Sequence, residues 1–395
     1  MTRSFLLSIF ATFWALSAHA QGCYQIGGSC LDPSTTELRL EFGKDVTDLS
    51  ALAQLADLRE LQIFTSLNFD APLDLVPLAS LKRLTKLTIS GAMITDLAPL
   101  AELEGLEHLS LSRISAVDLD PIAAITGLKV LALNGNDWLT DVPAGSLVKL
   151  ERLLVQDTGL KSVESLRGLS NLKSLVAFST PLSDLGPLSD LKTLEFLDIS
   201  FTKVTDLRPL GSMTALKTVY IKDIPATTLD GLAMAEGMRE LHADGAGIAD
   251  ISALSGKPEL RVLMLYDTNV VDLSPLRDAS ALGELGFNGT GVTDISPLAG
   301  LVTLYDLRFK ETAVTDITSL AGLTNLRSLT LPQQPLDLSA LRALDSVHIL
   351  RAPDLPGVDM TPLLDMESLE TLLPGDSKGV QLRGDEIATF IAERD

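Results

Sequence analysis

The chain has 395 residues, of which 46% are hydrophobic but only 5% aromatic, and its formal net charge is −21. A surface with this excess of carboxylates repels phosphate backbones and anionic lipid head groups, which argues against binding to nucleic acid or to a membrane surface. The charge suits either a basic partner or simple solubility. The core is expected to be built mainly from aliphatic side chains.

The first twenty residues have the pattern of a secretory signal peptide. Arg3 precedes an apolar run from Phe5 to Leu16, and Ala18-His19-Ala20 forms a cleavage site of the A-x-A type. The apolar run is too short to span a membrane. We therefore predict that residues 1–20 are a signal peptide, that the mature chain begins at Gln21, and that the protein is exported without membrane insertion. A lipoprotein anchored through Cys23 is the weaker alternative, because Gln21 is bulky where that signal requires a small residue.

Only two cysteines, Cys23 and Cys30, are present. In an oxidising compartment two cysteines this close together are expected to form a disulfide. The C-x-x-C spacing typical of redox and metal pairs is absent, and no histidine lies nearby in the mature chain. We predict a disulfide within an N-terminal cap formed by residues 21–34.

An apolar residue then recurs every 22 residues from Leu84 to Leu326. Within the unit that starts at Leu304, the segment Leu307-Arg308-Phe309 alternates with period two, which predicts a short strand with one buried face. In a neighbouring unit, Asp294 can cap the turn that follows, and Pro297 favours the start of a short helix. Apolar residues three apart, as at Ile295 and Leu298, suit a 3₁₀ turn.

Each unit is therefore one coil, and a lone coil could not bury its own apolar residues. We predict an α/β solenoid over residues 35–372, with about fifteen repeats stacked on one another. Residues 373–395 form a C-terminal cap, in which the segment from Asp385 to Arg394 has an amphipathic helical pattern.

The apolar positions follow an L-x-x-L-x-L pattern and precede a D-[L/I]-x-P-L segment, found at Asp96-Leu97-Ala98-Pro99-Leu100 and Asp206-Leu207-Arg208-Pro209-Leu210. This resembles the leucine-rich-repeat family, most closely its bacterial 22-residue internalin-like class. The resemblance implies a curved right-handed superhelix, with short parallel strands on the concave face and 3₁₀ or short helical turns on the convex face. It also implies a bacterial protein located in the periplasm, in the medium or on the cell surface.

The asparagine that bridges successive coils in that family is present here only at Asn136. Threonine occupies the position in six other coils, and its hydroxyl can donate and accept hydrogen bonds, so we expect a thinner ladder of the same kind.

Family members usually bind partners through the outward side chains of the strands, and here those of the middle coils are unusually apolar and aromatic. The predicted partner-binding residues are Leu154, Val176, Phe178, Phe196, Asp198, Tyr220, Lys222, His242, Met264 and Tyr266. Phe201, directly after its strand, is a further candidate, whereas later coils present Arg308 and Lys310. The alternative is that these side chains only cover one another on the sheet.

Catalysis is not expected. His108 and His242 lie six coils apart, about 29 Å at the usual strand spacing, so they cannot share a metal or a catalytic triad. The sequence has no zinc-protease, nucleophile-elbow or phosphate-loop motif. The aspartates that repeat along the coils could bind calcium, but one carboxylate per coil supplies too few oxygens, and capping explains them better. We expect no catalytic residues, no metal and no cofactor.

The sequence thus favours an exported, monomeric recognition protein with a protein partner. A structural or assembly component of the cell envelope is one alternative, and a carbohydrate-binding module is another. Aromatic side chains can stack on sugars, but those of the concave face include no tryptophan.

Overall fold

The computed structural model describes residues 23–26, 29–43, 46–65, 71–115, 117–353, 357–375 and 381–393. The predicted signal peptide, residues 1–20, and Gln21 lie outside the described residues.

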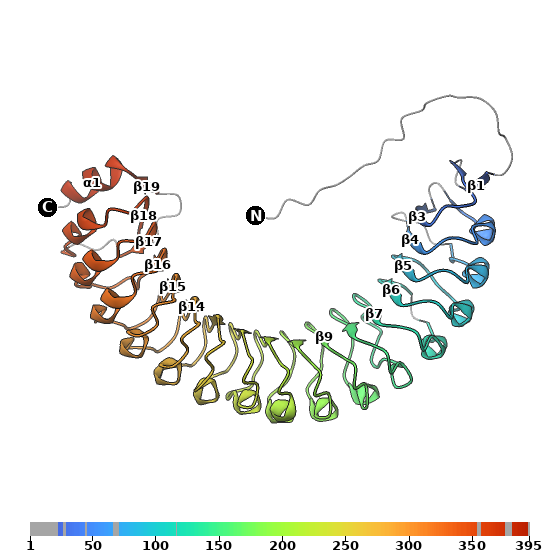
Figure 1. Cartoon of the computed structure of the whole chain (residues 1–395), viewed down its shortest axis with the longest axis horizontal. Coiled ribbons are helices and arrows are strands. Elements are labelled where there is room, and N and C mark those ends of the chain that lie inside the picture. The colour runs from blue at the N-terminus through green and yellow to red at the C-terminus, as the bar shows by residue number, and fades with distance from the viewer. Residues whose placement is uncertain are drawn as a thin grey trace.

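The described chain is a curved stack of coils, with strands along the inner side and short helical turns along the outer side (Figure 1). The strands are β1 (Tyr24–Ile26), β2 (Ser29–Leu31), β3 (Glu37–Phe42), β4 (Glu60–Thr65), β5 (Lys86–Ser90), β6 (His108–Ser112), β7 (Val130–Ala132), β8 (Arg152–Leu154), β9 (Ser174–Val176), β10 (Phe196–Asp198), β11 (Thr218–Tyr220), β12 (Glu240–His242), β13 (Val262–Met264), β14 (Glu284–Gly286), β15 (Asp306–Arg308), β16 (Ser328–Thr330), β17 (Ile349–Ala352), β18 (Thr371–Pro374) and β19 (Leu382–Arg383).

The turns on the outer side are 3₁₀ segments, and one α-helix follows the last strand. These elements are η1 (Ser50–Gln54), η2 (Val76–Ser80), η3 (Ala98–Glu102), η4 (Asp120–Ala124), η5 (Glu164–Leu166), η6 (Gly186–Leu188), η7 (Arg208–Ser212), η8 (Asp230–Leu232), η9 (Ser252–Leu254), η10 (Ser274–Leu276), η11 (Ser296–Leu298), η12 (Thr318–Gly322), η13 (Leu338–Ala343), η14 (Thr361–Asp365) and α1 (Asp385–Ala392). The predicted leucine-rich-repeat solenoid, with parallel strands inside and 3₁₀ turns outside, is confirmed.

The strands from β3 to β18 pair in parallel and in chain order, and β19 closes the sheet antiparallel to β18. The register advances by one repeat per strand: Leu175 pairs with Leu197, and Val219 with Leu241. The repeat length is constant from β5 to β16, and equivalent residues of successive coils stand side by side. Side chains at one repeat position therefore form continuous rows along the solenoid.

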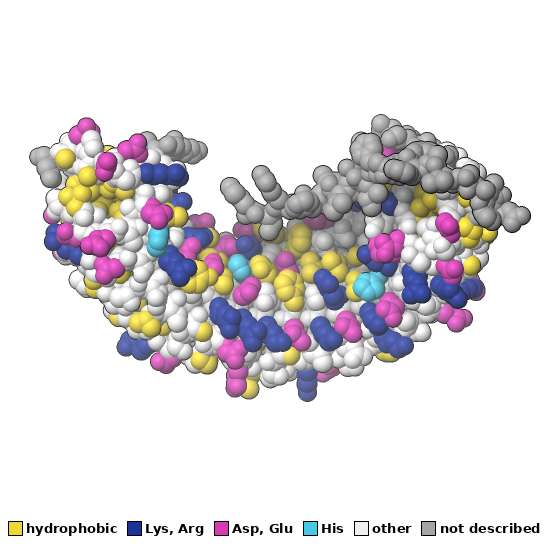
Figure 2. All heavy atoms as spheres, turned by 45° about the horizontal axis from the view of Figure 1, so that its top comes forward, with side chains coloured by type: hydrophobic (Ala, Val, Ile, Leu, Met, Phe, Trp, Pro, Cys, Tyr) yellow, Lys and Arg dark blue, Asp and Glu magenta, His cyan; other side chains and the backbone are white. Residues whose placement is uncertain are grey.

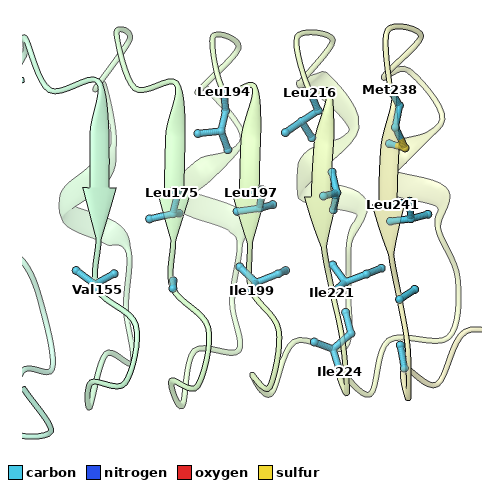
Figure 3. Close-up of a cluster of buried hydrophobic side chains, with 14 of the residues drawn as sticks. Val155, Leu175, Leu194, Leu197, Ile199, Leu216, Ile221, Ile224, Met238 and Leu241 are labelled. Atoms are coloured by element: carbon cyan, nitrogen blue, oxygen red, sulfur yellow. The ribbon is translucent and has the colours of Figure 1, made fainter. Parts of the chain in front are cut away.

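The core consists of such rows of aliphatic side chains. Figure 3 shows Leu194, Leu216 and Met238 in one row, with Leu197 and Leu241 in another, and all five are fully buried. Aromatic side chains enter the core later in the chain, where the Phe287 and Phe309 rings stack with centroids 5.5 Å apart. A single coil could not shield these side chains, so the stack folds as one unit.

The repeated aspartates start the 3₁₀ turns as expected. Asp96 accepts the Ala98 N–H at 2.8 Å, and Asp294 accepts the Ser296 N–H at 2.7 Å. The same bond forms at Asp184, Asp206, Asp250, Asp272 and Asp316. In several turns a proline follows within the first two positions, where no N–H donor is needed.

The threonine ladder differs from the expectation. Asn136 does bridge coils, because its Nδ2 donates to the Leu111 carbonyl at 2.9 Å and its Oδ1 accepts the Ile114 N–H at 2.9 Å. The Thr158 hydroxyl instead donates to the Val155 carbonyl of its own coil, three residues earlier. The other five threonines do the same. The shorter side chain reaches only its own strand end, so most coils are joined by backbone bonds and packing.

Different elements close the two ends. At the N-terminal end, β1 and β2 form a hairpin, and the predicted disulfide between Cys23 and Cys30 is present, with a Cα–Cα distance of 5.3 Å. At the C-terminal end, α1 buries Ile387 and Ile391. No helix within the described ranges is both long and apolar enough to cross a membrane. The domain boundaries at residues 20, 34 and 372 remain predictions.

Candidate recognition surface

The inner face of the sheet carries three rows of outward side chains. The central row contains Leu154, Val176, Asp198, Tyr220, His242, Met264, Gly286 and Arg308, which pair in register from β8 to β15. The near row lies two residues earlier and includes Phe196, and the far row lies two residues later and includes Phe178, Lys222 and Tyr266. The structure thus brings all ten predicted partner-binding residues onto one face.

An aromatic cluster lies at the centre of this face. The Phe196 and Tyr220 rings are 5.6 Å apart and tilted, and the Tyr220 and His242 rings stack with centroids 4.4 Å apart. Burial raises the pKa of the Tyr220 hydroxyl. Burial, and then the nearby Lys222 ammonium, lower the pKa of His242 below its usual value of 6.5. At neutral pH the cluster is therefore uncharged.

Polar contacts hold the charged groups within the rows. Lys222 Nζ lies 2.9 Å from an Asp244 carboxylate oxygen, and Asp198 accepts the Ser200 N–H at 3.0 Å. Lys222 is therefore paired with a charge of opposite sign, whereas Asp198 is held by a backbone amide.

Most of the predicted residues are half-buried, so mutual packing covers part of each side chain but leaves the rest open. Met264 departs from the expectation, because only 8% of it is exposed. It pairs in register with His242 and stands two residues before Tyr266 on the same face. Met264 therefore offers a partner little surface of its own.

Phe201 lies beyond the end of β10. It is 53% exposed, and its backbone has φ 58°, in the left-handed region that a bulky residue rarely adopts. The same repeat position has positive φ in neighbouring coils, where glycine stands at Gly135, Gly245 and Gly289. The turn geometry is therefore fixed by the repeat, and here it presents an aromatic ring to solvent.

Sequence reasoning missed the role of Gly286. This residue belongs to the central row, and a Cβ atom there would overlap the Tyr266 ring, which lies across it. Because Gly286 has no side chain, Tyr266 reaches the next coil, where Arg308 Nη1 donates to Tyr266 Oη at 3.2 Å. The Arg308 guanidinium is also held by Asp306. A glycine in a row otherwise made of side chains is the signal that could have indicated this close approach.

Ion pairs between successive coils border the near row. Glu107 pairs with Lys129 at 2.8 Å and Glu195 with Lys217 at 2.6 Å, each one repeat apart. Figure 2 shows hydrophobic side chains gathered along the middle of the inner curve, next to a border of basic and acidic ones. The surface is therefore apolar in the middle and charged at the edge.

Among the described residues, no group of three or more histidines, cysteines, aspartates or glutamates is placed to hold a metal ion. His108 and His242 stand on β6 and β12, with five strands between them.

Of the comparisons with known proteins, only the one with solved structures finds similar proteins. No protein-family model matches the chain, and no curated protein matches it either. Among solved structures, the internalin InlF of Listeria monocytogenes is 27% identical, with a TM-score of 0.69, over 76% of this chain and 89% of that one. The chain therefore has the leucine-rich-repeat fold and is similar to the internalins. A leucine-rich-repeat protein of Leptospira interrogans is 18% identical, with a TM-score of 0.71. The match covers 88% of this internalin-like chain and 98% of the Leptospira chain.

The plant peptide hormone receptor RGFR1, solved in complex with RGF2, has the same architecture. The receptor is 18% identical to the internalin-like chain, with a TM-score of 0.67. The match covers 87% of the internalin-like chain and 59% of the receptor chain. These neighbours are internalins, repeat proteins and receptors.

Proposed function

We propose that this internalin-like chain is an exported recognition protein that binds a protein partner through its concave face. The observation that carries the proposal is the aromatic cluster formed by Phe196, Tyr220 and His242, with Phe178 half-buried and Phe201 exposed on nearby coils. Aromatic side chains bury a large area at low entropic cost and supply most of the energy at interface centres. On a free monomer they expose apolar surface that a partner would cover.

The fold supports this role because it makes the surface rigid before binding. Phe196, Tyr220 and His242 stand on strands paired on both sides, above a fully buried aliphatic core. A preorganised surface loses little conformational entropy on association, so more of the contact energy appears as affinity.

Export is supported by the signal-peptide pattern of residues 1–20 and by the disulfide between Cys23 and Cys30, since disulfides persist in oxidising compartments.

The experiment is cross-linking and affinity capture from the native culture with the full mature chain. A variant carrying Phe178→Ser, Phe196→Ser and Tyr220→Ser should retain its thermal unfolding midpoint within a few degrees, because all three side chains are half-buried and none belongs to the core. It should lose partner capture at least about a hundredfold, since each interface aromatic contributes about 1–2 kcal/mol or more.

The matched control replaces three exposed apolar side chains away from the concave rows, Val76→Ser, Met234→Ser and Val302→Ser, which are 63%, 55% and 51% exposed. It should capture the partner as well as the unsubstituted chain. If the variant with the three concave substitutions still captures the partner, the concave face is not the binding surface.

A structural component of the cell envelope is the second candidate. The same rows could hold envelope proteins together permanently, and cell fractionation separates the two roles: release into the medium favours recognition, and stable retention in the envelope favours assembly. Carbohydrate binding, the third candidate, predicts signals on a glycan array that the three serine substitutions remove.

A further inference from the structure

A second feature of the concave face lies beside the aromatic cluster, over β13 to β18. It is a hollow of about 660 Å³, within the range of ligand-binding pockets. Its lining combines Tyr266 and Leu373 with polar side chains from successive coils, namely Asn288, Arg308, Lys310, Ser328, Thr330, Gln333 and Arg351.

The charge of this hollow is opposite to that of the protein. The described residues of its lining include three cations, Arg308, Lys310 and Arg351, and no acidic side chain, in a chain of net charge −21. Basic side chains on a strongly acidic protein create a local region of positive potential. A concave site focuses this potential, because less solvent surrounds the charges there.

Two of the cations are held in place. Arg308 is fixed between the Asp306 carboxylate and the Tyr266 hydroxyl, and its pKa is raised by the bond to Asp306, so it stays charged. The Lys310 ammonium lies 3.2 Å from Glu311, which is itself largely exposed. Arg351 is exposed, and no ion pair with a described residue forms there.

The spacing of the cations suits an extended peptide. Arg308 and Arg351 stand on β15 and β17, two strands apart, which corresponds to about 10 Å. An extended chain rises about 3.3 Å per residue and its alternate side chains share a face, so carboxylates two or four residues apart, at about 6.6 or 13 Å, bracket the spacing of the two guanidinium groups. Ser328 and Thr330, on the strand between them, add hydroxyl donors for the same oxygens.

We propose that this hollow binds the carboxylate groups of an acidic peptide segment. This inference rests on the proposed function, because the segment would belong to the protein partner whose apolar part covers the aromatic cluster. Tyr266 joins the two regions: it is a predicted partner-binding residue, and it also lines the hollow. Continuity with an aromatic surface favours a polypeptide over a free anion.

The test uses a fluorescein-labelled hexaglutamate peptide as the probe, with the full mature chain. We expect saturable binding that weakens with added salt, and no binding of a hexaglutamine peptide. A variant with Lys310→Gln and Arg351→Gln should bind hexaglutamate at least about tenfold more weakly, because it loses two charge-assisted contacts while Arg308 and Tyr266 keep theirs.

The control variant, Lys161→Gln with Lys203→Gln, makes the same change in net charge at two exposed sites outside the hollow. It should bind hexaglutamate like the unsubstituted chain. Equal losses in both variants would show a non-specific charge effect and overturn the proposal, as would the absence of hexaglutamate binding. A heparin hexasaccharide that binds more tightly than hexaglutamate, with the same dependence on Lys310 and Arg351, would overturn the peptide assignment in favour of an anionic glycan.

The test of the basic hollow can fail or succeed independently of the test of the proposed function. The variant with serine at positions 178, 196 and 220 retains every cation of the hollow, so it should still bind hexaglutamate. If it does, and also still captures the native partner, the aromatic assignment fails while the basic hollow stands.

Discussion

Lys257 occupies a repeat position at which other coils bury Leu301, Ala279, Ala235 or Met213. Only 2% of Lys257 is exposed, and its Nζ donates to the carbonyls of Ala233 and Ala235, at 2.8 and 3.0 Å. Removal from water lowers its pKa, because no carboxylate is close enough to offset the desolvation fully. The lysine is therefore a local source of instability within the aliphatic core.

Lys257→Leu should raise the free energy of unfolding at neutral pH by about 1–4 kcal/mol, because it replaces a buried charge by the residue type that the repeat uses here. Water in the adjoining hollow, which Ala233 also lines, can satisfy the released carbonyls. Urea unfolding measures the change, and Lys257→Ala, which leaves a cavity, should gain less. A leucine variant less stable than the parent would contradict this account.

The gain should also depend on pH. The folded protein binds fewer protons than the unfolded chain between the lowered pKa of Lys257 and its usual value of 10.5, so the stability of the unsubstituted protein rises with pH across that interval. The advantage of the leucine variant should therefore shrink as the pH approaches 10.5.

At the scale of the element, most 3₁₀ turns begin with an aspartate that accepts the N–H two residues later. At Asp294 both carboxylate oxygens are used, one by the Ser296 N–H and the other by the Ser296 hydroxyl at 3.0 Å. The aspartates act as local hydrogen-bond acceptors, which explains their repetition without a metal ion.

Asp294→Ala should lower the free energy of unfolding by about 1 kcal/mol, the usual cost of losing a side-chain cap. Asp294→Asn should cost much less, because its amide oxygen can accept the same N–H. Thermal unfolding with and without millimolar calcium completes the test. Two results together would indicate instead that the aspartates bind calcium through their charge. Calcium would raise the thermal unfolding midpoint by several degrees, and Asp294→Asn would destabilise the protein as much as Asp294→Ala.

At the scale of the whole molecule, stability is the sum of similar coils and the contacts between neighbours. Residues 269–290 form one complete 22-residue unit that includes η10 and β14. Because the units keep a constant phase, removal of one complete unit leaves every remaining leucine facing the core.

Deletion of residues 269–290 should therefore give a shorter solenoid that unfolds cooperatively, with a free energy of unfolding lower by about 1–3 kcal/mol, the share of 22 residues. Deletion of residues 269–279, half a unit, should destroy cooperative unfolding, because it brings a turn where a strand must pair. Circular dichroism and urea unfolding compare the two. Equal damage from both deletions would argue against an additive stack.

The sequence by itself determined the architecture of this protein, because a 22-residue period of leucines can be buried only by stacking equivalent coils. The same phase placed Phe178, Phe196 and Tyr220 on the outward face, and the short spacing of Cys23 and Cys30 indicated their disulfide. The aspartate bonds followed from local chemistry alone. Each of these depends on contacts within one coil or between equivalent positions of adjacent coils.

Only the tertiary structure decided what depends on the reach and direction of individual side chains. It showed that Met264 is buried, that the threonine hydroxyls bond within their own coils, and that Tyr266 crosses Gly286 to meet Arg308. It also gathered Arg308, Lys310 and Arg351 around one hollow. A repeat pattern specifies which face a residue occupies, but rotamers and the curvature of the stack decide what that residue contacts.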